Sequence, residues 1–297
     1  MSTFDQITDS TLLYLYGFTT LQDQATYLAS GATASGTTLN IADATAITRG
    51  ILEIEDELIW ADSVDTTALT VTVPPYGRGY RGTTAASHAA GVRVVSSPLF
   101  PRSLVKQAIN QTIQSVFPDL FGVGATTVTF NPAVSTYALP ADALDVLQVS
   151  WQSIGPSKEW LPIRRYRVDK HAATTVFSTG VTVSIYDAVV PGRSIRIVYT
   201  KQPTVLANPS DEYTTVTGLP ASTEDVIRLG ASYRMVPFFD SPHLSGMSAE
   251  ADFAANMRPV GGASQLGRYL LQLYQVRLAE ETKRLQSVYP QRSHYTR

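Results

Sequence analysis

The sequence contains no cysteine among its 297 residues. This absence excludes disulfide bridges, thiolate metal sites and cysteine nucleophiles, so the chain must be held together by packing or by assembly. No apolar run approaches the roughly 20 residues that span a bilayer. The N-terminus also lacks the basic and apolar regions of a signal peptide, and we therefore expect a protein that matures in a cytoplasm.

Charge is scarce as well. Charged residues make up 16% of the chain, below the roughly 25% of ordinary soluble domains. The net charge of −2 argues against a protein whose main task is to grip nucleic acid through a basic face. The chain is instead rich in hydrophobic residues (44%), with 34 threonines and 15 tyrosines. This composition favours β-structure and a surface that is partly covered by other protein.

Hydrophobic periodicity predicts helices that alternate with β-rich blocks. Helices are expected over residues 4–29, 103–117, 222–236, 249–257 and 265–288, and short alternating strands over residues 37–95 and 126–200. Gly17 interrupts the first helix, which is expected to resume over residues 21–28. The strands 50–54 and 57–60 flank Glu55-Asp56 and predict a hairpin, and Ser222 is the expected N-cap of its helix.

The separated helices can form one antiparallel bundle with the β-blocks inserted in its connections. The predicted fold class is therefore α+β, a helical bundle with two inserted antiparallel β-rich domains. The corresponding divisions are an N-terminal helical segment (1–30), a β-rich inserted domain (31–97), a bundle helix (98–122), a second β-rich inserted domain (123–205), bundle helices that include a long C-terminal helix (206–290) and a C-terminal tail (291–297).

Two motifs contain the residue types of enzyme signatures, but they lack the surrounding elements or partner motifs that those signatures require. Residues 77–82, Gly-Arg-Gly-Tyr-Arg-Gly, match the dinucleotide fingerprint, which requires a strand that leads into a helix. Here Pro74-Pro75 precedes the motif and another strand follows it, so we expect a glycine-shaped loop. Ser103-Leu-Val-Lys106 matches the Ser-x-x-Lys of penicillin-recognising enzymes, but the partner motifs are missing and Ser103 is expected to cap a helix.

The densest acidic cluster is Glu53, Glu55, Asp56 and Glu57. We expect a solvated hairpin tip with Glu53 and Glu55 on one strand face, and an adventitious cation site is the alternative. A histidine metal site is not expected, because the four histidines lie far apart in the sequence, and no Gly-x-Ser-x-Gly elbow is present. A Ser/His/Asp triad stays open, and neither a catalytic residue nor a cofactor is assigned. The histidines are His88, His171, His243 and His294.

The basic patches are Arg164-Arg165-Tyr-Arg167 and residues 283–297. Such patches can contact DNA phosphates, or they are solvated charge or pair with acidic groups on a protein partner. Solvated charge or pairing with a protein partner is favoured here over DNA contact, because the whole chain is slightly acidic.

Two stretches resemble structural proteins of tailed bacteriophages. Residues 69–92 resemble a phage module in which a strand runs into an "Arg-Gly-x-x-Gly-Thr-x-Ala-x-x-His" loop. Residues 98–240 resemble the phage head-to-tail adaptor (connector) proteins. The resemblance rests on the order of Phe117-Pro118, Tyr137-Ala-Leu-Pro140, Val146 to Trp151, Trp160 to Tyr166, Pro191 to Tyr199, Gly218-Leu-Pro220 and Leu229-Gly-Ala-Ser-Tyr-Arg234.

The resemblance implies a structural virion protein of the neck. It implies a ring of twelve copies beneath the portal that extends the DNA channel, with the tail or a stopper/tail-terminator protein as a further partner. Packaged DNA would pass without sequence-specific binding, and neither a membrane nor a cofactor is implied. The block 31–97 is extra and is expected to decorate the outer rim. The implied portal-docking residues are Gln291, Arg292, Ser293, His294, Tyr295, Thr296 and Arg297.

Two other functions compete with this one. A tail or baseplate protein with a receptor- or glycan-binding β-domain requires an exposed Trp60, Trp151 or Trp160 as a sugar platform. A hydrolase of cell wall or capsule requires paired carboxylates in a cleft, for which Glu53 with Glu55 is the only local candidate.

Overall fold

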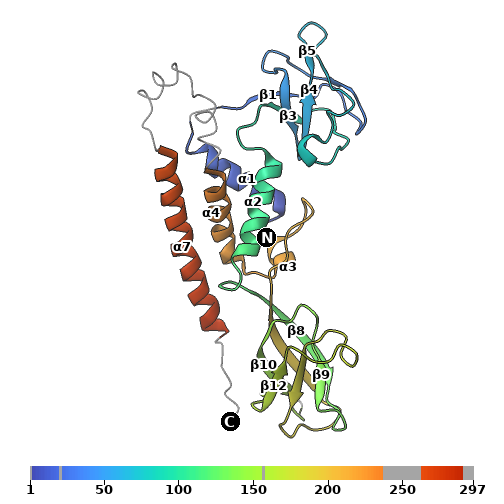
Figure 1. Ribbon diagram of the computed structural model, residues 1–297, viewed down its shortest axis with the longest axis vertical. Helices are drawn as coiled ribbons and strands as arrows, with labels where there is room; N and C mark the ends of the chain where they lie inside the picture. Colours follow the sequence, from blue (N-terminus) through green and yellow to red (C-terminus); the bar gives the residue numbers. More distant parts are fainter. Residues whose placement is uncertain (1, 20–21, 156–157, 237–261, 290–297) are drawn as a thin grey trace. The chain divides into compact units, whose positions relative to one another are not determined.

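The fold is mixed helix and sheet, as the α+β prediction expects. A computed structural model of the chain describes residues 2–19, 22–155, 158–236 and 262–289 (Figure 1). Within these ranges, five helices accompany four antiparallel sheets. No described helix combines the length and apolar character that a membrane crossing requires. The chain divides into two compact units, one of residues 1–4, 112–226 and 275–297 and one of residues 5–111 and 227–274, and each is described by itself.

The first β-block forms two small sheets with the strand orders β1-β7-β3-β4 and β2-β6-β5. Its elements are β1 (Gln24–Tyr27), β2 (Thr38–Asn40), β3 (Gly50–Ile54), β4 (Glu57–Ala61), β5 (Ser63–Asp65), β6 (Thr70–Thr72), the 3-10 turn η1 (Tyr80–Gly82) and β7 (Arg93–Ser96). Strand alternation directs Leu52, Ile59 and Val71 into one buried core. The predicted hairpin is confirmed, because β3 pairs with β4 and Ile54 lies opposite Glu57.

The prediction that the first helix resumes over residues 21–28 is wrong. The helix α1 (Phe4–Tyr16) ends before Gly17, and residues 24–27 form the strand β1 instead. β1 pairs antiparallel with β7, with Gln24 opposite Ser96 and Tyr27 opposite Arg93. A distant partner strand therefore overrides the local helical pattern.

The remaining helices are α2 (Arg102–Ser115), α3 (Tyr213–Thr217), α4 (Glu224–Met235) and α7 (Gly262–Val288). α2 buries the predicted apolar stripe, which includes Val105, Ile109 and Ile113. Leu229 of α4 and Leu270 of α7 lie in one apolar cluster, and Tyr14 of α1 packs against it. The candidate helix 249–257 lies outside the described residues.

Ser222 does not cap α4 as predicted. It lies in the 3-10 turn η2 (Ala221–Thr223), directly before α4 begins at Glu224. Its hydroxyl donates to Glu281 Oε2 at 2.6 Å, so its partner lies on α7 rather than in the first turn of its own helix.

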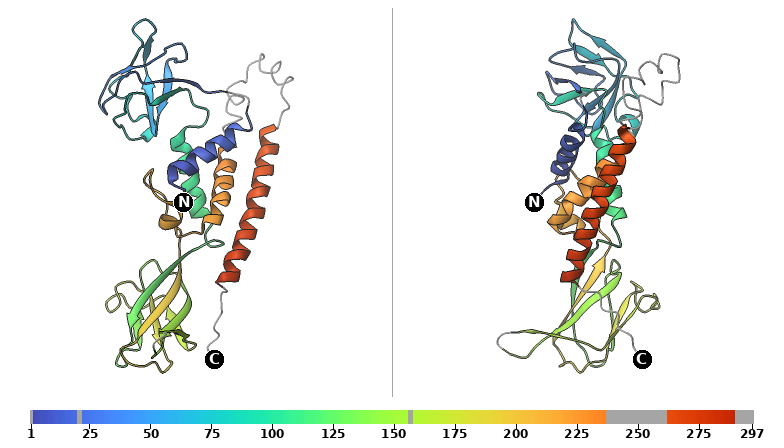
Figure 2. Two further views of the ribbon diagram at one scale, coloured as in Figure 1. Left: turned by 180° about the vertical axis from the view of Figure 1, so that it is seen from behind. Right: turned by 90° about the vertical axis from the view of Figure 1, so that its left-hand side faces the viewer.

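The second β-domain, residues 122–201, also contains two antiparallel sheets, whose orders are β11-β10-β14-β8 and β12-β13-β9 (Figure 2). The strands are β8 (Gly122–Thr129), β9 (Thr136–Ala138), β10 (Asp145–Gln152), β11 (Trp160–Pro162), β12 (Tyr166–Asp169), β13 (Thr182–Ile185) and β14 (Ser194–Lys201). Both sheets contribute to one core that includes Val149, Val183 and Ile197. Apolar packing between the sheets therefore holds this domain together.

The pairing of β8 with β14 places Gly124 opposite Tyr199, whose side chain is buried. A Cβ atom at position 124 would lie 2.5 Å from the Tyr199 ring. Glycine is therefore required at this position so that the aromatic ring can cover the strand.

Gly124→Ala is expected to destabilise the protein by about 1–3 kcal/mol, because the added methyl group collides with a buried ring. The matched control is Gly155→Ala, since a Cβ at position 155 meets nothing within 4 Å. Urea unfolding of both variants measures the difference. Equal stability of the two would show that Tyr199 can move aside.

Candidate functional site

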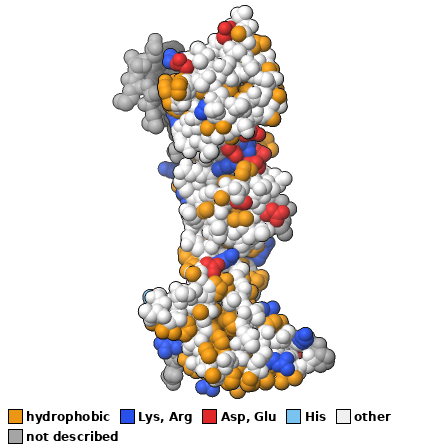
Figure 3. Space-filling view, turned by 90° about the vertical axis from the view of Figure 1, so that its right-hand side faces the viewer, with side chains coloured by type: hydrophobic (Ala, Val, Ile, Leu, Met, Phe, Trp, Pro, Cys, Tyr) orange, Lys and Arg blue, Asp and Glu red, His pale blue; other side chains and the backbone are white. Residues whose placement is uncertain are grey.

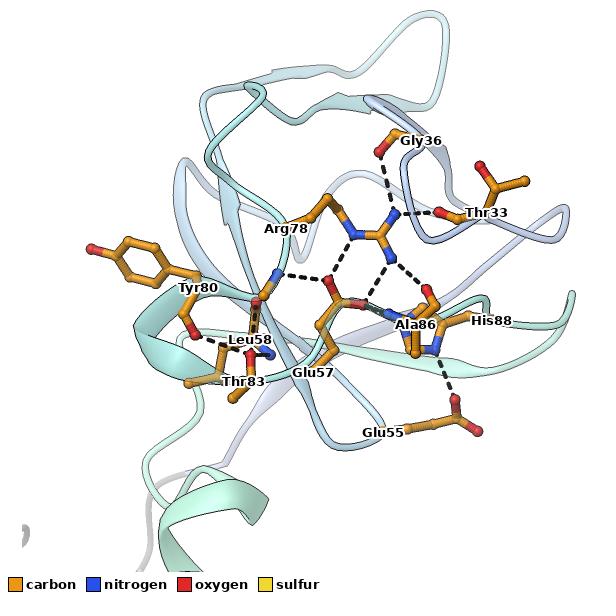
Figure 4. A network of polar contacts seen from close by, with 11 residues as sticks. Thr33, Gly36, Glu55, Glu57, Leu58, Arg78, Tyr80, Thr83, Ala86 and His88 are labelled. Atoms are coloured by element: carbon orange, nitrogen blue, oxygen red, sulfur yellow. Dashed lines mark hydrogen bonds and ion pairs between the residues drawn. The ribbon is translucent and has the colours of Figure 1, made fainter.

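A dense hydrogen-bond network of the first β-block surrounds the side chain of Glu57, the first residue of β4. Its carboxylate is fully buried and lies opposite Arg78 in an ion pair with 1% and 7% side-chain exposure (Figure 4). Oε1 accepts from Arg78 Nε at 2.7 Å and from the Gly79 amide at 2.9 Å. Oε2 accepts from Arg78 Nη2 at 2.8 Å and from the Ala86 amide at 3.0 Å. The two-pronged pair thus leaves neither group unsatisfied.

Arg78 uses its remaining donors to hold the surrounding loops. Nη2 donates to the carbonyl of Ala86 at 2.6 Å, and Nη1 donates to the carbonyls of Thr33 and Gly36, the latter at 3.3 Å. One guanidinium therefore joins the loop after β1, the loop before η1 and the segment before β7 (Figure 4). Only arginine offers this many donors in a fixed plane, so lysine is no substitute here.

His88 completes the network from the other side. Its Nε2 lies 2.8 Å from Glu57 Oε2 and its Nδ1 lies 2.7 Å from Glu55 Oε2. The His88 side chain is 1% exposed and that of Glu55 is 57% exposed. His88 also exchanges main-chain hydrogen bonds with Ala32. The imidazole therefore bridges two carboxylates, and neither of its nitrogens lies against a serine as a Ser/His/Asp triad requires.

The pKa of Glu57 shows which forces win in this network. Burial alone raises the pKa, because it disfavours the charged form. Hydrogen bonds from Arg78, from the amides of Ala86 and Gly79 and from His88 outweigh burial and lower the pKa to about 2. Glu57 is thus a carboxylate anion whose charge is balanced by Arg78 inside the fold.

The glycine after Arg78 has a geometric reason. Gly79 has φ of +60° and its amide donates to Glu57. A Cβ at Gly79 would lie 2.7 Å from the Thr83 carbonyl oxygen. The Arg-Gly pair of the loop motif therefore supplies the guanidinium and the tight turn that brings it to Glu57. The loop motif was visible in the sequence. Its partner, the Glu57 carboxylate, lies outside the motif, and the sequence analysis did not predict the pair.

A second buried carboxylate joins the first β-block to helix α2. Glu53 Oε2 accepts from the amide of Arg102, the first residue of α2, at 2.6 Å. Glu53 is therefore the capping group of α2, and the predicted cap, Ser103, lies inside the helix. Burial raises the pKa of Glu53 to about 7, although the Arg102 amide and charge oppose the shift.

An ion-pair cluster surrounds this cap. Lys106 Nζ lies 2.6 Å from both Asp5 and Asp56, and Arg102 pairs with Asp5 at 3.4 Å and with Asp56 at 3.5 Å. Arg102 also pairs with Asp9 of α1. Lys106 of the Ser-x-x-Lys motif is therefore held by two carboxylates, which is a structural role.

The expected solvated hairpin tip is thus wrong for Glu53 and Glu57, which are both buried. Glu53 points to α2 and Glu55 points to His88, so the two do not form the pair that a hydrolase requires. Across the described ranges, no group of three or more aspartate, glutamate or histidine residues could hold a metal ion. The cluster has a structural role in the fold.

The three candidate sugar platforms are half-buried. Trp60 lies against Tyr80 at 5.5 Å between ring centroids, and Trp160 lies beneath the Arg196 guanidinium at 4.6 Å. Trp151 packs against the core of the second β-domain. Trp60 and Trp160 thus each have one side chain of the protein against the ring.

Exposed apolar side chains gather on the second β-domain. Figure 3 shows hydrophobic side chains spread over its surface, with Lys and Arg near the margin. The exposed large residues are Val134, Leu144, Ile154, Leu161, Val176, Tyr186 and Val190. Residues 122–201 also hold eight Lys or Arg against five Asp or Glu. Exposed apolar side chains of this size are available for contact with other proteins.

The other predicted contact residues are placed as follows. The amides of Arg164 and Arg165 donate to Asp187 Oδ2, at 2.8 and 3.1 Å, while their side chains and that of Arg167 are exposed. The implied docking residues 291–297 lie outside the described residues.

Glu57→Gln is expected to cost about 3–5 kcal/mol, because it leaves the buried Arg78 guanidinium without its counter-charge. Glu55→Gln is the matched control and should cost about 1 kcal/mol or less, since Glu55 is largely exposed. Urea unfolding followed by tryptophan fluorescence measures both. A loss at Glu57 no larger than that at Glu55 would contradict the structural role of the buried pair.

The raised pKa of Glu53 predicts a pH dependence. Because the folded pKa of about 7 exceeds the ordinary value of 4.5, the contribution of Glu53 to stability is full below about pH 4.5 and is lost as the pH rises through 7. The Gln side chain of Glu53→Gln cannot ionise, so the variant avoids this loss. The difference in free energy of unfolding between the variant and the native protein should shift in favour of the variant by about 2 kcal/mol from pH 5 to pH 8.

The control for this experiment is Glu159→Gln at an exposed position, which should follow the native protein at every pH. A difference between Glu53→Gln and the native protein that stays constant from pH 5 to pH 8 would refute the assignment.

Comparison with known proteins gives one result that bears on identity. The family model of the SU10 adaptor protein matches residues 83–278, which is well over half of the chain. A search of curated proteins finds no match. The matched range contains helix α2, the second β-domain and α4. The resemblance to phage head-to-tail adaptors is thereby confirmed, and the chain belongs to the SU10 adaptor protein family.

Proposed function

We propose that this phage adaptor forms a ring of twelve copies between the portal and the tail and extends the DNA channel. Membership of the SU10 adaptor family is the observation that carries the proposal. The role is structural, and the partners are other copies of the chain, the portal protein and a tail or stopper/tail-terminator protein. Its place is the neck of the virion. Electron microscopy that shows a twelve-fold ring tests the stoichiometry directly.

The surface of the second β-domain supports a role in assembly. Ile154 and Val176 are 63% and 72% exposed, although large apolar side chains usually gain by burial. Contact with neighbouring proteins in a ring or at the tail would remove such groups from water.

The charge balance supports passage of DNA rather than its retention. The chain carries a net charge of −2, which a ring of twelve copies multiplies. A mildly acidic channel does not hold phosphates, whereas a basic one would. We therefore infer that packaged DNA passes through the ring without sequence-specific binding.

The predicted divisions fit this role. The family model begins at residue 83, so most of the block 31–97 lies before the matched range. This supports its assignment as an addition to the family's common part, and we propose that it decorates the outer rim. The helical segments 98–122 and 206–290 would form the bundle at the centre of each subunit, with the domain 123–205 inserted between them.

The segment 291–297 is the proposed portal-docking element. It contains two arginines and one histidine and no acidic residue, and it follows helix α7. A short basic segment suits an acidic cleft in a larger partner.

Deletion of Gln291 to Arg297 is expected to abolish docking to the portal and leave the subunit folded. The described core residues all precede this segment, so the thermal unfolding midpoint should not change. Co-sedimentation with purified portal rings measures docking. A variant with the same residues in scrambled order is the matched control for length and charge. Normal docking of the truncated chain would contradict the assignment of residues 291–297 as the portal-docking element.

A further inference from the structure

Strand β8 forms one edge of the four-stranded sheet of the second β-domain. Within the described ranges it has a single neighbouring strand, β14, to which it pairs over its whole length from Gly122 to Thr129. The main-chain donors and acceptors on its other side have no strand to pair with there. Such an edge is a template on which another strand can pair.

The outward groups follow from the hydrogen-bond pattern. Phe130, directly after β8, donates its amide to the Arg193 carbonyl on the β14 side. In an antiparallel ladder the direction alternates from residue to residue, so even-numbered residues of β8 face β14. The amides and carbonyls of the odd-numbered residues therefore face away from the sheet, and these residues are Val123, Ala125, Thr127 and Thr129.

This edge lacks the usual protection. The opposite edge of the same sheet, β11, has three residues and ends at Pro162, which has no amide to donate. β8 has eight residues, Gly-Val-Gly-Ala-Thr-Thr-Val-Thr, with no charge and no proline. Natural sheets protect long edges with lysine, proline or a bulge, and β8 has none of these.

We propose that β8 pairs antiparallel with β8 of a second copy and joins two sheets into one. The two-fold axis would pass through Thr126. Val123 would then lie opposite Thr129 of the second copy, and Ala125 opposite Thr127. This register pairs the outward-facing residues with each other, so the strand is its own complement.

The side chains favour this occupant over others. The side chains of the odd-numbered residues of β8 are only Val, Ala and Thr, which suit cross-strand contacts. The nearest cations of the sheet, Arg196 and Lys201, lie on β14, one strand away from the axis. An uncharged edge offers nothing to attract an acidic or basic partner, whereas an identical uncharged edge meets no repulsion. The pairing concerns free subunits and does not depend on docking of the 291–297 segment.

The experiment is sedimentation velocity of the full chain from about 1 μM to about 1 mM, the range in which weak self-association is measured. We expect a shift from monomer to dimer as the concentration rises. Thr127→Pro should abolish the dimer, because it removes an outward amide while the ladder to β14 keeps its bonds. Circular dichroism and thermal unfolding check that the variant folds.

A series of charged substitutions on β8 tests the same interface without the effect of a proline on folding. Thr127→Lys alone should weaken the dimer at least about tenfold, because it adds a charge to the edge. Combined with Ala125→Glu, it should recover most of that loss, since the carboxylate at position 125 would lie opposite the ammonium group at position 127 of the second copy. Combined with Ala125→Lys, it should remove the dimer completely. The matched control is Thr174→Lys, at an exposed loop position away from β8.

Hydrogen exchange provides the second readout. Dimerisation through β8 should slow exchange at the amides of Val123, Ala125, Thr127 and Thr129 as the concentration rises. A monomer at every concentration overturns the proposal. So does a dimer that ignores the charge series, or slow exchange of these amides in the monomer, which would mean that a segment of the same chain covers the edge.

Discussion

The buried pair of Glu57 and Arg78 is the interaction on which the first β-block depends. A charge without a partner is costly in a protein interior, and here each partner satisfies the other in two places. The remaining donors of Arg78 then fix the loops that no strand holds. The core around Leu52 and Ile59 supplies the free energy, and the ion pair decides which loop conformation accompanies that core.

The two β-regions reach stability by different routes. The first combines a small apolar core with buried ions, and Glu53 extends this scheme to the start of α2. The second β-domain relies on the contact between two sheets, with Tyr199 packed over Gly124. This adaptor thus contains one region in which polar bonds join the loops and one region whose apolar side chains extend onto the surface.

Local patterns predicted local structure well. Alternation located the hairpin of β3 and β4, and the helical stripe located α2, since both signals lie within a few residues. The patterns could not predict that Glu53 and Glu57 are buried, because Arg102 and Arg78 follow them by 49 and 21 positions. The strand β1 was missed for the same reason, since its partner β7 lies far along the chain. The Arg-Gly and His motif was visible, but the carboxylate that explains it was not part of the motif.

The contacts of the Glu57 network have one more consequence. Every partner described for Glu57, Arg78 and His88 lies between Ala32 and His88. The network therefore needs no hydrogen bond from the described helices or from the second β-domain. A change elsewhere in the chain thus leaves Glu57, Arg78 and His88 paired, whereas the buried Glu53 of the same block has its partner, Arg102, on α2.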